Sequence, residues 1–179
     1  MSSGRRIAVE SVGAGALLAV AGALAWVTGR PLVFPSLGPS AYVLATDAES
    51  TTASRVLGGH AVGVVAGLVS YHALAGGAFA LAAHPPADPA AARLAVSAVC
   101  AVGLTTAGTA AARVRHTPAC ATTLIVALGL LSTPADALVV GVGVTALYLS
   151  AVAGRRALGV ARARGRSGTA KPPADEGRT

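Results

Sequence analysis

The stretch Arg115-His116-Thr117-Pro118-Ala119-Cys120-Ala121-Thr122-Thr123 interrupts an otherwise apolar chain, and Phe34-Pro35-Ser36-Leu37-Gly38-Pro39-Ser40-Ala41 repeats its pattern in the first half. Both stretches place prolines and small hydroxyl residues before a short apolar run. Proline is tolerated in the first turn of a helix, because its missing N–H would have no partner there. The pattern therefore predicts two broken helices, which begin at Pro39 and Pro118.

Short helices are expected over residues 40–46 and 119–133. A helix that begins inside a membrane directs its free N–H groups and the positive end of its dipole at whatever occupies the site. An anion is the ligand that such a helix start stabilises best. We therefore expect the two broken segments to hold an anion near the middle of a bilayer.

The composition predicts an all-α integral membrane protein. Of the 179 residues, 54% are hydrophobic and only 12% are charged, about half the charged fraction of a soluble domain. The net charge of +7 arises mostly in the C-terminal tail, as is typical of a cytoplasmic tail. Aromatic residues make up only 3% of the chain, so it lacks the stacking surfaces of single-strand binders, and we expect no nucleic-acid partner.

Four long apolar spans are predicted in a transmembrane helical domain over residues 1–153. They cover about 12–27, 56–82, 94–112 and 136–153. The halves at about 5–83 and 90–153 share one order, a long span, a proline-broken segment and a second long span, which predicts an internal repeat. The basic tail over 154–179 is expected to be disordered.

The bundle crosses the membrane four times if the broken segments dip in and return, and six times if they traverse it. The distribution of arginines favours six crossings, which leave only Arg30 and Arg93 outside and make the repeat inverted. We expect a plasma-membrane protein with both termini in the cytoplasm. The arginines that six crossings place inside, apart from the tail, are Arg5, Arg6, Arg55, Arg113 and Arg115.

Glycines at every fourth position, Gly59, Gly63 and Gly67, form a small-residue face on the second long span. Such a face allows close helix packing, and it makes a homo-oligomer an open alternative. Cys100 and Cys120 show no metal-ligand spacing. We therefore expect no metal, no cofactor and no catalytic residue.

Three motifs in order resemble the HPP family of integral membrane proteins, over about residues 5–153. They are the stretch from Phe34 to Ala41, Arg55-Val56-Leu57-Gly58-Gly59-His60, and His116-Thr117-Pro118-Ala119-Cys120-Ala121-Thr122. The resemblance implies a membrane protein with four spans, and plant chloroplast members are associated with nitrite transport. The family is named for a His-Pro-Pro motif.

The chain contains this tripeptide literally at His84-Pro85-Pro86, in the link before the third span. The family motif follows that span and opens an apolar segment. His116 and Pro118 meet this context, with Thr117 in place of the first proline. We therefore interpret the literal match as a decoy.

The predicted substrate site centres on His116, which either lines a permeation site or caps the end of the third span. Arg115 adds a positive field or anchors the chain at the headgroups. Hydroxyl groups either bind an oxyanion or bond to their own helix backbone. The complete predicted site is His116, Thr117, Pro118, Ala119, Thr122, Ser36, Gly38, Ser40, His60 and Arg115.

These features predict a transporter or channel for a small inorganic anion, with nitrite as the leading candidate through the resemblance. One alternative is a structural or regulatory membrane subunit without transport activity. A less favoured alternative is a metalloprotein that uses His60, His72, His84 and His116. The expected partners are an anion and the lipid bilayer.

Overall fold

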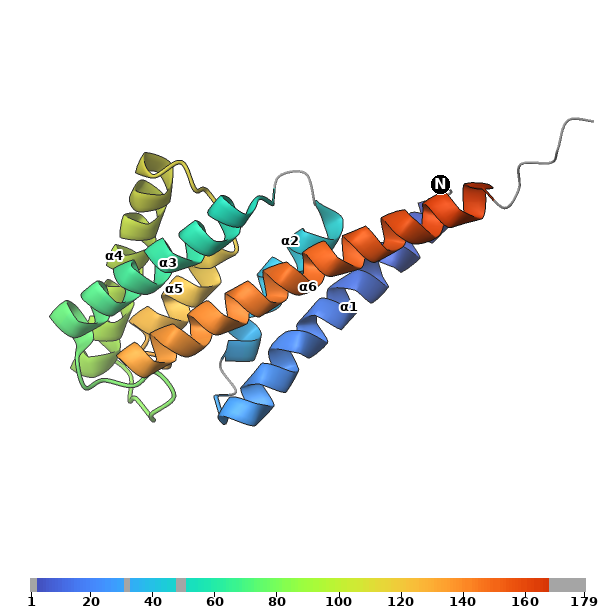
Figure 1. Cartoon of the computed structure of the whole chain (residues 1–179). Coiled ribbons are helices and arrows are strands. Elements are labelled where there is room, and N and C mark those ends of the chain that lie inside the picture. The colour runs from blue at the N-terminus through green and yellow to red at the C-terminus, as the bar shows by residue number, and fades with distance from the viewer. Residues whose placement is uncertain (1–2, 31–32, 48–50, 168–179) are drawn as a thin grey trace, which may run out of the picture.

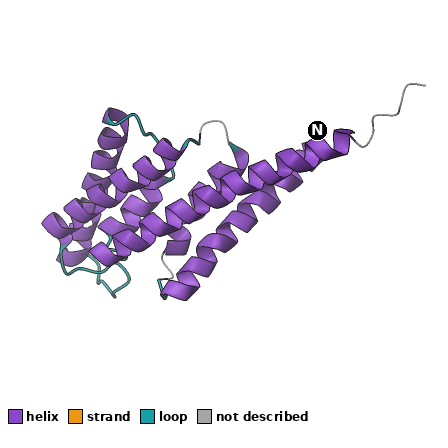
Figure 2. Cartoon of the chain, viewed as in Figure 1, coloured by secondary structure: helices purple, strands orange, loops and turns teal. Residues whose placement is uncertain are grey.

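The computed structural model describes residues 3–30, 33–47 and 51–167, and every regular element in these ranges is a helix (Figure 2). Four helices are long and apolar enough to cross a membrane, which confirms the prediction of an all-α membrane bundle. The elements are α1 (Ser3–Thr28), α2 (Val33–Thr46), α3 (Ala53–Ser70) continued by the π-helical turn η1 (Tyr71–Ala75), α4 (Pro89–Ala111), α5 (Ala119–Ala127) and α6 (Pro134–Ser167).

Capping residues explain where two of the spanning helices begin. Thr52 precedes α3, and its hydroxyl accepts the N–H of Arg55 at 3.4 Å. Asp88 precedes α4, where its carboxylate accepts the N–H of Ala91 at 3.1 Å and Pro89 takes the first helical position. Each cap satisfies one backbone donor that the first turn leaves without a partner.

α2 runs antiparallel to both α1 and α5. A Cβ atom built on Gly38 of α2 would lie 3.9 Å from Leu18 of α1, and one on Gly13 of α1 would lie 3.6 Å from Ala45 of α2. Residues 36 and 40 of α2 pair in the same reversed order with residues 122 and 116. The short helix α2 therefore runs back along the bundle.

α3 and α5 run in parallel, because Gly59 and Gly67 of α3 meet His116 and Val126 in the same order. α4 and α5 are antiparallel, since Thr105 of α4 bonds Thr123 and Ser97 bonds the carbonyl of residue 127. Successive helices thus alternate in direction from α1 to α6 (Figure 1).

The alternating helix directions are those expected if the chain crosses the membrane six times. A four-crossing path would require α1 and α3 to run in opposite directions, whereas here they run in the same direction and α2 returns between them (Figure 1). The halves α1–α3 and α4–α6 run in opposite directions, as an inverted repeat requires. The start of α1 and the end of α6 lie at the same end of the bundle.

We call this shared end the basic end. It also carries the links from α2 to α3 and from α4 to α5, so it gathers most of the arginines of the described residues. The opposite end carries the other three links. The arginines of the basic end include Arg5, Arg6, Arg55, Arg113, Arg115, Arg155 and Arg156.

Three predicted boundaries were wrong. α2 begins at Val33, and Pro39 lies inside it, because Pro35 already occupies the first turn, where proline is favoured. α5 ends at Ala127 rather than at residue 133, since Gly129 takes a left-handed φ of 79° just beyond it. The tail is helical as far as Ser167, and residues 168–179 lie outside the described part of the chain.

Candidate functional site

Two histidines and two hydroxyl residues form a buried cluster where α2, α3 and α5 meet. The Oγ atom of Ser40 lies 2.8 Å from Nε2 of His60 and 3.2 Å from Nε2 of His116. Nδ1 of His60 lies 2.9 Å from Oγ1 of Thr122. The two imidazole rings are tilted by 58°, with centroids 5.3 Å apart. All four side chains are buried, so this is a polar site inside an apolar bundle.

The hydroxyl groups set the direction of the hydrogen bonds. Thr122 donates to the carbonyl of Ser36 at 3.4 Å, so its hydroxyl accepts from the Nδ1–H of His60. A neutral imidazole carries one N–H, and Nε2 of His60 therefore accepts the hydroxyl proton of Ser40. The remaining contact is a donation from the Nε2–H of His116 to Ser40. The four side chains thus form one continuous chain of hydrogen bonds.

The glycine face of α3 makes this cluster sterically feasible. A Cβ atom on Gly59 would lie 2.7 Å from Cβ of His116, and one on Gly63 would lie 2.7 Å from Oγ1 of Thr123. On Gly67 it would lie 2.7 Å from Cβ of Val126. The predicted packing face is confirmed, and it packs against the segment from His116 to the end of α5.

Five other predicted residues surround the cluster without joining it. Thr117 and Pro118 line a hollow of about 310 Å³ beside Pro39 and Tyr42. Ala119 is buried against Gly63. Arg115 is exposed, and Gly38 faces α1.

The predicted free N–H groups at the start of α5 are already used. The N–H groups of Ala119, Cys120 and Ala121 donate to the carbonyls of residues 116, 117 and 118 at 3.0–3.1 Å. α5 therefore begins with a tight 3₁₀ turn that satisfies its own donors. In addition, Ser36 and Ser40 lie within α2 and not at its start, so the cluster brings side chains together rather than two helix N-termini.

A pair of threonines on the other side of α5 was absent from the predicted site. Oγ1 of Thr105 lies 2.9 Å from Oγ1 of Thr123, and both side chains are buried. Thr123 also donates to the carbonyl of Ala119 at 3.1 Å. The sequence could have indicated this pair through Thr105, a hydroxyl residue in the middle of the apolar span of α4. Many such residues, however, bond only to their own helix.

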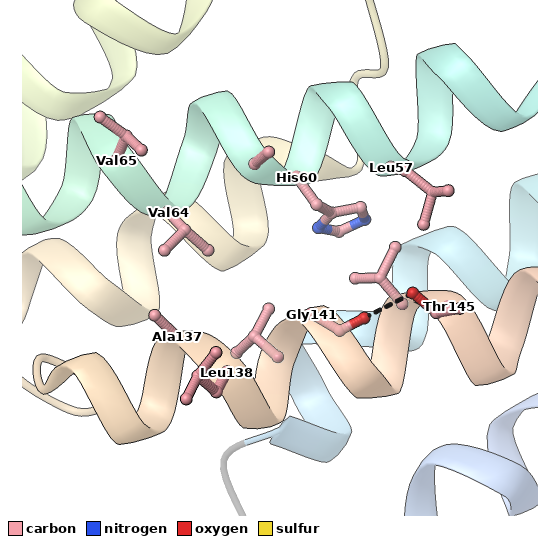
Figure 3. Close-up of a pocket in the computed structure, with 11 residues that line it drawn as sticks. Leu57, His60, Val64, Val65, Ala137, Leu138, Gly141 and Thr145 are labelled. Carbon is pink, nitrogen blue, oxygen red and sulfur yellow. Dashed lines mark hydrogen bonds between the residues drawn. The ribbon is translucent and has the colours of Figure 1, made fainter.

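His60 also lines a cavity of about 420 Å³ between α3 and α6 (Figure 3). Its ring points from α3 into the space between the two helices. The rest of the lining is mainly apolar, with Thr145 donating to its own helix at the Gly141 carbonyl at 2.8 Å. His60 therefore joins the hydrogen-bonded cluster to an apolar cavity that is open on its outer side, where Val65 and Leu138 are exposed.

The literal His-Pro-Pro tripeptide lies in the link before α4, at the opposite end from His116. Nδ1 of His84 lies 2.6 Å from the carboxylate of Asp88, and Nε2 lies 3.0 Å from the carbonyl of Phe79. Asp88 is the residue that caps α4. The tripeptide therefore lies beside a helix cap and is separate from the cluster.

The other histidine, His72, bonds the carbonyl of Ser132 at 3.0 Å and lies away from the cluster. Within residues 3–30, 33–47 and 51–167, no three His, Cys, Asp or Glu side chains are placed to hold a metal ion. The four histidines thus occupy three separate places in the fold.

The apolar spans, the alternating helices and the buried polar cluster define a helical integral membrane protein with an internal polar site. The family model described as "HPP, transmembrane region" matches residues 1–163. The chain belongs to the HPP transmembrane family. No curated protein and no solved structure matches it significantly.

Proposed function

We propose that the protein transports a small inorganic anion across the membrane and that nitrite is its substrate. The observation that carries this proposal is the cluster of His60, Ser40 and His116. Ionisable side chains inside a membrane bundle are costly, and by default they indicate a substrate or proton pathway. Their position in a protein of the HPP transmembrane family supports a transporter-type function.

The charge distribution supports an anion as the substrate. The basic end carries the exposed residues Arg55, Arg113 and Arg115 around the links that lead to the cluster. Such a concentration of positive charge raises the local concentration of anions and their rate of association. His60 lies eighth in α3, about 11 Å along the helix axis at 1.5 Å per residue. The cluster therefore lies within reach of anions that collect at the basic end.

The chemistry of the cluster supports an oxyanion. An oxyanion that displaces their present partners accepts hydrogen bonds from Ser40, Thr122 and the imidazole N–H groups, which replace the water lost by a partly dehydrated anion. Protonation of either imidazole gives a cation, which places a positive charge beside the bound anion. Nitrite, with its two oxygen acceptors, fits such a set of donors. It is also the substrate associated with plant members of the HPP family.

By the same charge rule, the basic end is the cytoplasmic end, and the plasma membrane is the proposed location. A structural or regulatory subunit remains the alternative function. Flux measurements separate the two, because a structural subunit does not move anions by itself.

The test is uptake of nitrite, nitrate, formate and chloride into proteoliposomes that contain the purified protein. We expect nitrite uptake above that of protein-free vesicles, and we expect His116→Ala to lower the rate and flatten its pH dependence. His84→Ala is the matched control, because it removes a histidine at the other end of the bundle. Equal rates in protein-containing and protein-free vesicles would refute the proposal, and a larger effect of His84→Ala would place the site elsewhere.

A further inference from the structure

We propose that His116, Ser40 and His60 form a proton relay that protonates the anion in the α3–α6 cavity. The transported species is then the neutral conjugate acid of a weak-acid anion. This inference rests on the proposed anion transport and specifies its substrate class and its coupling ion.

The positions of the two histidines give the relay its direction. His116 follows the exposed Arg115 in the link at the basic end, and 7% of its surface remains exposed. His60 is 2% exposed and lines the cavity between α3 and α6 (Figure 3). Ser40 lies within hydrogen-bond distance of both rings. A proton that arrives at His116 from the basic end therefore has a continuous route to the cavity wall.

The transfer is balanced in bonds and charge. A proton binds Nδ1 of His116. Its Nε2–H bond breaks as an O–H bond forms at Ser40, and the former hydroxyl proton of Ser40 forms an N–H bond at Nε2 of His60. His60 is then the cation, and His116 is neutral again.

In the final step an anion oxygen takes the place of one hydroxyl partner of His60. One N–H bond of the imidazolium breaks and the O–H bond of the conjugate acid forms. The transfer of this proton makes both His60 and the former anion neutral. Rotation of the Ser40 hydroxyl and proton exchange at His116 restore the starting hydrogen bonds.

The apolar cavity explains why protonation is required. Its walls on α6 include Val140 and Val144, and on α3 they include Val64. A bare anion is costly in such surroundings, whereas a small neutral acid is much less so. Anions of weak acids, such as nitrite and formate, accept a proton from an imidazolium far more readily than nitrate or chloride. The relay and the cavity together therefore select for the conjugate base of a weak acid.

The groups in contact with the two rings are hydroxyls and apolar side chains, so the extra proton resides on an imidazole. Their hydrogen-bond partners on α2 and α5 are the hydroxyls of Ser40 and Thr122. α6 presents the mainly apolar cavity wall. The charged neighbours along the chain are Arg115, directly before His116, and Arg55, five residues before His60, and both are exposed. We attribute the pH response to the two histidines, which are the titratable side chains of the hydrogen-bonded cluster.

The experiment uses proteoliposomes that contain the full chain and a trapped pH indicator, with the membrane potential clamped. Protein-free vesicles give the passive leak of neutral acids, which is subtracted. We expect nitrite and formate to enter with about one proton each, driven by the pH gradient and insensitive to the potential. We expect no transport of nitrate or chloride.

Ser40→Ala removes the bridge and should lower coupled flux about a hundredfold, at the low end of the contribution of a positioned proton donor. Ser40→Thr restores the hydroxyl and should restore the flux and its pH profile. Ser97→Ala is the matched control, because Ser97 is also a buried hydroxyl but bonds the Ala127 carbonyl at 2.9 Å. If Ser40→Ala does not fold, His116→Gln replaces it, since glutamine keeps a donor but cannot relay a proton.

The outcomes separate the relay from the proposed function. Transport of nitrate and chloride at rates that follow the membrane potential would overturn the relay while anion transport stands. Retained proton coupling in Ser40→Ala, or in His116→Gln if that variant is needed, would also overturn it. Absence of any flux above protein-free vesicles would refute both.

Discussion

The guanidinium of Arg30, just beyond the end of α1, forms an ion pair with the carboxylate of Asp136 in the first turn of α6. The carboxylate also accepts the backbone N–H of Thr133 at 3.0 Å and its hydroxyl at 2.6 Å. Asp136 is only 3% exposed. This pair joins the first helix of one half to the last helix of the other, at the end opposite the basic end.

Arg30→Ala should therefore destabilise the bundle. The substitution leaves a buried carboxylate with only the donors of Thr133, and loss of a charged hydrogen-bond partner costs about 1–3 kcal/mol. The measurement is thermal unfolding in detergent. Arg93→Ala is the control, because it removes an exposed arginine from the same end of the bundle. Equal stability of the two variants would show that the pair contributes little.

Gly63→Ala should disturb the contact between α3 and α5. The new Cβ atom would lie 2.7 Å from Oγ1 of Thr123 and 3.0 Å from the Ala119 carbonyl, and overpacking of this kind costs about 1–3 kcal/mol. Gly103→Ala is the control, since a Cβ atom there meets nothing within 4 Å. Thermal unfolding in detergent compares them, and Gly63→Leu should be worse. If Gly63→Leu left the thermal stability in detergent unchanged, the packing contact between α3 and α5 would be contradicted.

Cysteine labelling should place residue 112 in the cytoplasm and residue 87 outside. These positions lie in links at opposite ends of the bundle, and the four-crossing path would exchange their sides. The experiment uses Ala112→Cys and Ala87→Cys in a background without Cys100 and Cys120, with an impermeant reagent applied to intact cells. External labelling of residue 112 together with protection of residue 87 would refute six crossings.

The His84 cap should make stability depend on pH. The carbonyl of Phe79 and the carboxylate of Asp88 raise the pKa of His84 above its ordinary value of 6.5. A raised pKa in the folded state means that the stabilisation is fully present below pH 6.5 and is lost as pH rises through the folded pKa. The melting temperature should fall over that window in the wild type, relative to His84→Gln. Parallel curves for the two proteins would contradict a charged cap.

Composition and hydrophobic runs were enough to predict the helical membrane class, because a bilayer requires long apolar helices whatever their arrangement. The glycines of α3 also predicted a packing face, since their four-residue spacing is a local property of a helix. The HPP motifs predicted the family, and the positions of the arginines favoured six crossings over four.

Helix ends were predicted less well, because competing local signals had to be weighed. Either Pro35 or Pro39 is acceptable in the first turn of a helix, and in the structure Pro35 occupies the first turn of α2. In the tail, alanine and arginine favour helix, and α6 continues past Gly154, where Arg155 donates to the carbonyl of Leu44 at 3.4 Å.

Only the tertiary structure decided which polar residues meet. The sequence singled out His116, Ser40, His60 and Thr122, but their spacing gave no reason to join two imidazoles through one hydroxyl. That contact requires α5 to lie antiparallel to α2 and close against the glycines of α3. It results from packing between segments 20 to 76 residues apart in the chain, whereas sequence patterns report only which residues share a face of their own helix.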